Sequence, residues 1–208
     1  MKILEKDIFE YLQINRSARI LDWGCGKGEM LDKLKDNDFL NCSGVEINSD
    51  FARADIEIVE DTISFLEERP STFDVIYVRE SAYYISKENQ SRLWSGFFRA
   101  LNPNGALIVV TFNGALKTSD WIIQKDFGIH FAFNEISLSD LALKAGFGEL
   151  EVLGIKPINR TPIGKFLAYC LSIYRRVHSS LAYISERGLC HFNPRLFEKN
   201  IVLLARKL

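Results

Sequence analysis

The sequence predicts a doubly wound α/β fold, in which helices cover both faces of a mostly parallel sheet. Strand-like apolar segments alternate with helix-like segments from one end of the chain to the other. A glycine-rich turn follows the first strong strand, within the stretch "RILDWGCGKGEML" over residues 19–31. The chain has 208 residues, of which 47% are hydrophobic and 25% charged, so it can form one substantial core.

The spacing of apolar residues predicts the elements in chain order. The first half reads as a helix over 3–13, a strand over 18–23, a helix over 28–36, a strand over 42–47, a short helix over 48–55, a strand over 56–61 and a short helix over 62–68. The second half reads as a strand over 73–80, a helix over 89–101, a turn over 102–105, a strand over 106–112, a helix over 137–147, and strands over 149–155 and 199–207. We expect the last strand to run antiparallel.

Particular residues justify these boundaries. The apolar run 18–23 stops at the glycines, as a buried strand does at a turn. Pro103 and Gly105 both interrupt regular structure, which predicts the turn between helix and strand. Ser137 is expected to cap the start of the late helix, and Gly146 to end it.

One segment, residues 156–198, breaks the alternation, so we expect a single domain over 1–208 with a helical insertion there. Within it, 161–188 has the spacing of an amphipathic helix. One face carries an apolar stripe made of Phe166, Cys170, Ile173, Val177, Leu181 and Ile184. Another face is basic, with Lys165 and Arg176. Packing of the stripe on the core is favoured, beside the loop over 111–131 that follows the fifth strand and that we call the acceptor loop. An oligomer interface and a membrane surface are the alternatives.

Composition excludes several classes of protein. The net charge of -1 argues against nucleic-acid binding through bulk charge. Acidic residues interrupt residues 1–20, which do not resemble a signal peptide, and the apolar run 166–174 is too short to span a bilayer. The four cysteines form no CxxC pair or cluster with metal-ligand spacing, so we expect free thiols, no metal and a cytoplasmic location.

The three glycines Gly24, Gly26 and Gly28 invite three interpretations. A phosphate-binding P-loop requires Ser or Thr after the lysine, but Gly28 follows Lys27. A dinucleotide fingerprint requires glycine at position 29, where this chain has Glu29. That glutamate also places negative charge where a pyrophosphate would bind. A ligand without phosphates is the remaining interpretation.

The octet "LDWGCGKG" resembles the first motif, (D/E)xGxGxG, of the class I S-adenosylmethionine-dependent methyltransferases. The resemblance extends over most of the chain. Glu46 ends the second strand, as the family's ribose-binding acid does. Four later segments are similar to the family's later motifs: "EDTISFL" (60–66), "FDVIYVRESAYYI" (73–85), "FFRALNPNGALIVVTF" (97–112) and "SDLALKAGF" (139–147). The compact chain with its late insertion looks like the branch that acts on small molecules or glycans.

The resemblance implies S-adenosyl-L-methionine as cofactor and S-adenosyl-L-homocysteine as product. It assigns the methionine end of the cofactor to the turn, namely Asp22, Gly24, Cys25, Gly26 and Gly28. Glu46 would bind the ribose, because a carboxylate accepts hydrogen bonds from two vicinal hydroxyls. Asp61 and Thr62 would bind the adenine. Other roles stay open: a turn cap for Asp22, a solvated strand end for Glu46 and a helix N-cap for Asp61.

The acceptor side is expected on the loops after the fourth and fifth strands. The catalytic candidates are Glu80, Tyr83, Tyr84 and His130, with wall, strand-end or packing roles as alternatives. The (D/N)PP(Y/F) motif of nucleic-acid amino-methylating relatives is absent from the sequence. We therefore expect methyl transfer to a small molecule or glycan precursor, at oxygen. A quinone or lipid methyltransferase, or a non-catalytic cofactor-binding protein of the same fold, is the alternative.

Overall fold

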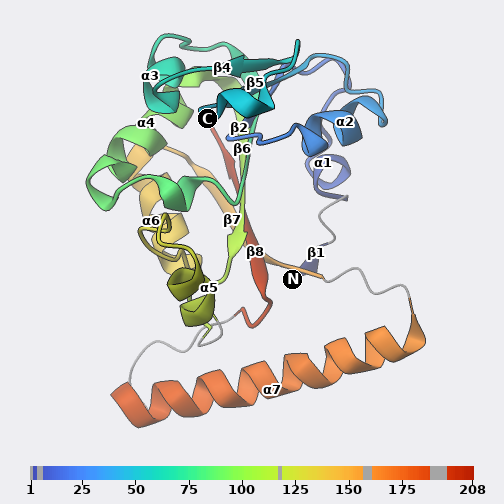
Figure 1. Cartoon of the computed structure of the whole chain (residues 1–208), viewed down its shortest axis with the longest axis vertical. Coiled ribbons are helices and arrows are strands. Elements are labelled where there is room, and N and C mark those ends of the chain that lie inside the picture. The colour runs from blue at the N-terminus through green and yellow to red at the C-terminus, as the bar shows by residue number, and fades with distance from the viewer. Residues whose placement is uncertain (1, 4–6, 117–118, 157–160, 188–195) are drawn as a thin grey trace.

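The computed structural model describes the chain except for residues 1, 4–6, 117–118, 157–160 and 188–195 (Figure 1). Its described strands form one eight-stranded sheet in the order β1-β7-β8-β6-β5-β2-β3-β4. The strands are β1 (Lys2–Ile3), β2 (Ile20–Trp23), β3 (Cys42–Glu46), β4 (Ile56–Ile58), β5 (Phe73–Arg79), β6 (Leu101–Phe112), β7 (Glu149–Ile155) and β8 (Asn200–Arg206). All pairs are parallel except those of β8, which runs antiparallel to β6 and β7. The predicted doubly wound fold with an antiparallel last strand is confirmed.

Helices cover both faces of this sheet, as Figure 1 shows. One face carries α1 (Ile8–Tyr11) and α2 (Glu29–Lys35), and the other carries α3 (Thr62–Glu67), α4 (Gln90–Ala100) and α6 (Glu135–Ala145). The remaining helical elements are α5 (Ser119–Lys125), α7 (Pro162–Arg187) and the short 3-10 turns η2 (Ser49–Phe51), η3 (Ala82–Tyr84) and η4 (Lys87–Asn89). Two apolar clusters, one under each helical layer, form the core. The carboxyl ends of the central parallel strands therefore meet at one edge of the sheet.

The N-terminal segment differs from its prediction as one helix over 3–13. Lys2 and Ile3 instead pair with Gly154 and Ile155 of β7, and the helix is confined to α1. Pairing with an edge strand of the sheet satisfies backbone groups that a short isolated helix leaves without partners. This tertiary contact is invisible to local apolar spacing.

Two further boundaries also differ. The predicted turn 102–105 lies inside β6, as a bulge: Phe73 pairs with Leu101, but Val75 already pairs with Ala106. The helix predicted from Ser137 begins earlier, because Asn134 is its N-cap and Ser137 is the reciprocal partner in a capping box. Its predicted end at Gly146 is confirmed, with φ +108°.

The predicted packing of the 161–188 stripe on the core is wrong. Figure 1 shows α7 lying past one end of the sheet, away from both helical layers. Phe166, Ile173, Val177 and Leu181 are all exposed, and so is Cys170; the Ile184 side chain lies outside the described part. Because α1, α2, α3, α4 and α6 already cover the sheet, no face of it remains for this stripe. No described helix, α7 included, has the length and apolarity needed to cross a membrane.

Candidate functional site

The glycine-rich turn joins β2 to α2 at the carboxyl edge of the sheet. Gly24, Gly26 and Gly28 all have left-handed φ values, of +70°, +54° and +79°. The amides of Gly24 and Cys25 donate hydrogen bonds to the carbonyl of Val45, at 2.9 and 3.2 Å. The turn is thus fixed against the end of β3, and only glycine adopts this backbone at all three positions without strain.

The three glycines serve different purposes. A Cβ on Gly24 would lie 2.5 Å from the Cβ of Ser81, and a Cβ on Gly28 would lie 2.9 Å from the Arg53 guanidinium. A Cβ on Gly26 would meet no heavy atom within 4 Å. Gly24 is therefore required by packing inside the protein, whereas at Gly28 the neighbouring arginine end can move and the left-handed φ is the stronger constraint. Gly26 is the one whose backbone a ligand can approach.

Glu46, at the end of β3, is held against this turn. One carboxylate oxygen accepts a hydrogen bond from the Gly26 amide at 2.8 Å, and the other accepts from the Ile47 amide at 2.8 Å. The side chain is half-buried. These contacts exclude the solvated strand end considered from sequence, and they leave carboxylate lone pairs to accept further hydrogen bonds.

Asp22 lies one residue before the end of β2 and is only 2% exposed. The amides of the turn donate elsewhere: those of Gly24 and Cys25 to the Val45 carbonyl, that of Gly26 to Glu46 and that of Gly28 to the Cys25 carbonyl, so Asp22 does not cap them. Burial raises the pKa of Asp22 to about 7, although the charge of Arg79 lowers it and that of Glu46 raises it further. A positive charge placed next to Asp22 would stabilise the ionised form of this buried carboxylate.

Trp23 and Cys25 lie close to Asp22 in the sequence. Burial, with the charges of Asp22 and Glu46, raises the pKa of the Cys25 thiol to about 12. The thiol is therefore protonated and is a poor nucleophile. The indole N–H of Trp23 donates to the carbonyl of Thr62 at 3.2 Å, which joins the end of β2 to the start of α3.

Asp61 is the N-cap of α3. Its carboxylate accepts hydrogen bonds from the Ile63 amide at 2.8 Å and the Ser64 hydroxyl at 2.7 Å. These bonds, the Ser64 hydroxyl foremost, lower the pKa of Asp61. The capping role considered from sequence is therefore present, and Thr62 behind it is buried.

The loop after β5 touches the glycine turn. The Ser81 hydroxyl donates to the carbonyl of Trp23 at 3.0 Å, next to the Cα of Gly24. Glu80, just before it, has a left-handed φ of +52°, a strained conformation for a residue with a side chain. Asn200 of β8 donates to the Glu80 carboxylate at 3.4 Å. Strain at this strand end, beside the turn, is typical of functional sites.

Tyr83 and Tyr84 differ in their surroundings. Tyr83 is buried against the rings of Tyr84 and Phe112, with centroids 4.8 and 5.1 Å away, and burial raises its pKa well above the usual range. Tyr84 is exposed, and its hydroxyl donates to the Asp126 carboxylate at 2.7 Å. Tyr83 is thus packed among aromatic rings, whereas Tyr84 has a polar contact.

The backbone of His130 contacts the loop after β5. Its amide donates to the carbonyl of Tyr83 at 3.0 Å, and its side chain is exposed. The His130 side chain lies near enough to Glu88 to contribute to lowering the pKa of that carboxyl, after hydrogen bonds at Glu88 itself and from Ser86. The structure therefore brings Glu80, Tyr83, Tyr84 and His130 to one region. Among the described residues, no acid, histidine and cysteine cluster is suited to a metal ion.

Sequence reasoning missed three members of this region: Ser81, Asp126 and Asn200. Ser81 directly follows the candidate Glu80, so its position at the strand end could have indicated that it lies in the site. Asp126 is followed by Gly128, whose amide donates to it at 2.9 Å, a local turn signal. Asn200 reaches Glu80 across 120 residues of sequence, and no local signal could reveal that contact.

A family model described as a methyltransferase domain matches residues 3–152. The phosphoethanolamine N-methyltransferase of Plasmodium falciparum is 25% identical over an alignment of 125 residues that covers 56% of this chain and 47% of that protein. The matched region thus spans about half the length of that relative.

Solved structures share the fold. An S-adenosylmethionine-dependent methyltransferase from Archaeoglobus fulgidus has a TM-score of 0.69 at 17% identity, covering 97% of this chain and 92% of its own. The Haemonchus contortus phosphoethanolamine N-methyltransferase 2, in complex with S-adenosyl-L-methionine, has a TM-score of 0.59 at 20% identity, covering 96% of this chain and 51% of its own.

Proposed function

This chain belongs to the family of methyltransferase domains, and from that premise we propose that it methylates a hydroxyl group of a small molecule or glycan precursor. The methyl donor is S-adenosylmethionine. When bound, this donor supplies an electrophilic methyl group on a sulfonium centre.

The observation that carries the proposal is the hydrogen bond between Glu46 and the Gly26 amide, with Asp22 buried beside it. Glu46 would bind the ribose hydroxyls, and the open backbone at Gly26 would admit the donor close to the turn. Asp22 would compensate a cationic group, which its ionised form requires in so buried a position. Two carboxylates at this edge suit a cation and repel phosphates.

The adenine assignment rests on the start of α3. Thr62 is tied to the end of β2 through Trp23, so this segment lies against the same strand end as the glycine turn. Asp61 already caps the helix with both oxygens. We propose that it contributes to adenine binding through the position it gives Thr62 and Ile63.

The acceptor is proposed to enter between the loop after β5 and the loop that contains α5. Tyr83 would form a wall, while Glu80, the Tyr84–Asp126 pair and His130 offer polar groups at its entrance. Transfer to a hydroxyl requires a group that accepts its proton, and an exposed imidazole is suited to that task near neutral pH. His130 is therefore the proposed base.

A second acceptor class has a specific observation in its favour. Aromatic rings and carboxylates converge here, from Tyr83, Tyr84, Glu80 and Asp126, and this combination attracts a cationic amine. A relative of this chain is named as a phosphoethanolamine N-methyltransferase. A small amine is thus the alternative to a hydroxyl.

Transfer of a labelled methyl group distinguishes these acceptors. The purified chain would be incubated with methyl-labelled S-adenosylmethionine and separate pools of hydroxylated small molecules, glycan precursors, amines, quinones and lipids. Label in the hydroxyl pools is the expected result. Label confined to the amine pool would establish the second candidate. Absence of any cofactor binding by calorimetry would contradict both and favour the non-catalytic alternative.

A further inference from the structure

Helix α7 presents its apolar side chains to solvent. Phe166, Leu181 and Ile163 are 66%, 61% and 74% exposed, and six further large apolar side chains of the helix are also exposed: Leu167, Tyr169, Leu171, Ile173, Tyr174 and Val177. From the charge and place of this helix, we propose that α7 docks the protein on an anionic membrane surface.

The exposed apolar residues share one side of the helix. Phe166, Ile173, Val177 and Leu181 recur at intervals of seven and four residues, so they point the same way. Ser172 and Arg175 lie on the other side and are only partly exposed. A helix of 26 residues with one long apolar side and one polar side matches the pattern of helices that lie in a membrane interface.

The charge of α7 identifies the partner. Residues 162–185 contain three basic residues and no acidic one. Arg175 and Arg176 occupy the middle of the helix, and the Arg176 guanidinium lies 5.3 Å from the centroid of the Phe197 ring. Anionic lipid headgroups complement these cations.

A second copy of the chain complements them poorly. Residues 162–187 are centred between Tyr174 and Arg175. In an antiparallel two-fold pair joined through the apolar side, Arg175 and Arg176 would stay at the middle of the outer, polar side of each helix. Residues 162–185 of the second helix offer these cations no acidic partner, whereas anionic lipid headgroups do. A lipid surface is thus favoured over self-association.

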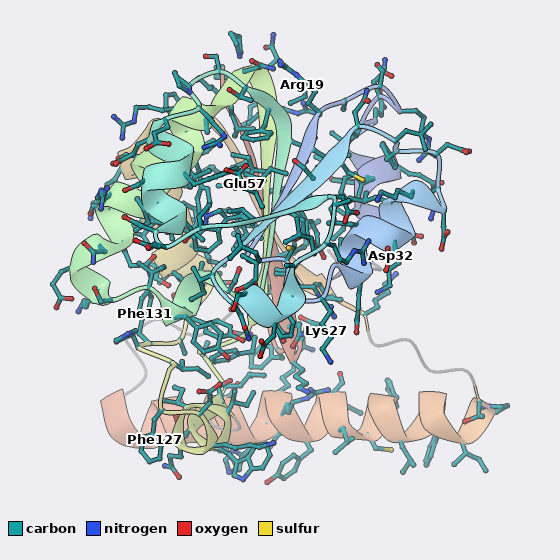
Figure 2. The ribbon with its side chains drawn as sticks, turned by 45° about the horizontal axis from the view of Figure 1, so that its top comes forward. Arg19, Lys27, Asp32, Glu57, Phe127 and Phe131 are labelled. Carbon is teal, nitrogen blue, oxygen red and sulfur yellow. The ribbon has the colours of Figure 1, made fainter. Side chains whose placement is uncertain are left out.

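The position of α7 relative to the sheet is consistent with docking on a membrane surface. In Figure 2, Arg19, before β2, lies at the far end of the sheet from α7, whereas Lys27, after β2, lies toward α7. In both views α5 is the helix of the body nearest to α7. The α5 region adds two exposed aromatic side chains, Trp121 at 65% and Phe127 at 98%. Docking through α7 would therefore bring the carboxyl edge, with the candidate site, toward the membrane.

Vesicle co-sedimentation of the full chain tests the proposal. Vesicles of pure phosphatidylcholine are compared with vesicles that contain about one third phosphatidylglycerol, a fraction chosen to give a strong negative surface potential. We expect the wild type to pellet with the anionic vesicles and to be released by salt. Arg176→Glu should weaken this binding by about fivefold or more, and Leu181→Asp by about tenfold or more.

Matched controls lie at the opposite, amino edge of the sheet or on the body. Leu40→Asp changes a leucine that is 73% exposed. Lys33→Glu makes the same charge change as Arg176→Glu, at an exposed position of α2. Both controls should bind vesicles like the wild type. All four variants should keep the wild-type melting temperature, because the side chains are exposed.

Three results would overturn the proposal: a folded wild type that leaves anionic vesicles unbound, equal binding to both vesicle types, or a stable dimer in solution that Leu181→Asp dissociates. Vesicle binding is measured without cofactor, and cofactor affinity is measured by calorimetry without vesicles. Failure of the docking is thus separable from failure of the proposed function.

Discussion

Asp22 is subject to opposite demands from stability and from ligand binding. Its pKa is about 7 in the folded protein, against an ordinary 3.8. Between pH 4 and 7 the folded chain therefore holds a proton that the unfolded chain releases, so the free energy of unfolding falls as the pH rises through this window. Above pH 7 the loss is complete and amounts to roughly 2–4 kcal/mol.

Asp22→Asn should remove that pH dependence. The variant should be more stable than the wild type at pH 8, and the difference should vanish near pH 4, as measured by denaturant unfolding. Calorimetry should show weaker S-adenosylmethionine binding by the variant. The wild type should lose about tenfold in affinity from pH 8 to 6, because the cation favours ionised Asp22. If Asp22→Asn bound S-adenosylmethionine at pH 8 as tightly as the wild type, Asp22 would have no part in cofactor binding.

Gly24 and Gly26 form a matched pair of test positions. Gly24→Ala would drive its Cβ to 2.5 Å from the Cβ of Ser81, so it should destabilise the fold by several kcal/mol. Gly26→Ala meets no protein atom and carries only the strain of its φ, about 1 kcal/mol. Thermal melts should separate the two variants. Calorimetry should show that Gly26→Ala, although folded, loses cofactor affinity; a folded Gly26→Ala that binds normally would show that no ligand approaches there.

The acceptor loop is the element that carries the catalytic prediction. One of its hydrogen bonds to η3 comes from the backbone amide of His130, so His130→Ala removes the imidazole and leaves that bond in place. Turnover should fall about 100-fold or more, the scale of general base catalysis, while cofactor affinity stays unchanged. Initial rates with the labelled donor measure the effect. If His130→Ala transferred methyl groups at the wild-type rate, His130 would not be the base, and Glu80 would be the next candidate.

Elements with strong local signals were predictable, and those set by distant contacts were not. The glycine turn and the end of α6 at Gly146 follow from local backbone chemistry. The start of α6 did not, because Asn134 and Ser137 are both good caps and only the reciprocal hydrogen bonds decide between them. Strand β1 depends on β7, about 150 residues away, which local spacing cannot report.

At the scale of the whole molecule, amphipathic spacing predicted that α7 has an apolar side but not where that side points. A helix with this pattern can be covered by its own core, by a partner or by a membrane. The sheet was already covered on both faces, and that follows only from the arrangement of all the helices (Figure 1). In the same way, the motifs predicted a donor site, whereas the contact of Ser81 with Gly24 joins it to the acceptor side only in the folded chain.

Calorimetric titration of the chain with S-adenosylmethionine, alongside Glu46→Ala and the control Glu57→Ala on the exposed part of neighbouring β4, tests the central claim most directly. The wild type and Glu57→Ala should bind one equivalent with equal affinity. Glu46→Ala should bind more weakly by about 1.5–3 kcal/mol, the scale of hydrogen bonds to a charged acceptor, while its circular dichroism remains that of the wild type. A folded Glu46→Ala with unchanged affinity, or a folded wild type that binds no S-adenosylmethionine, would contradict the assignment of this strand end as the donor site.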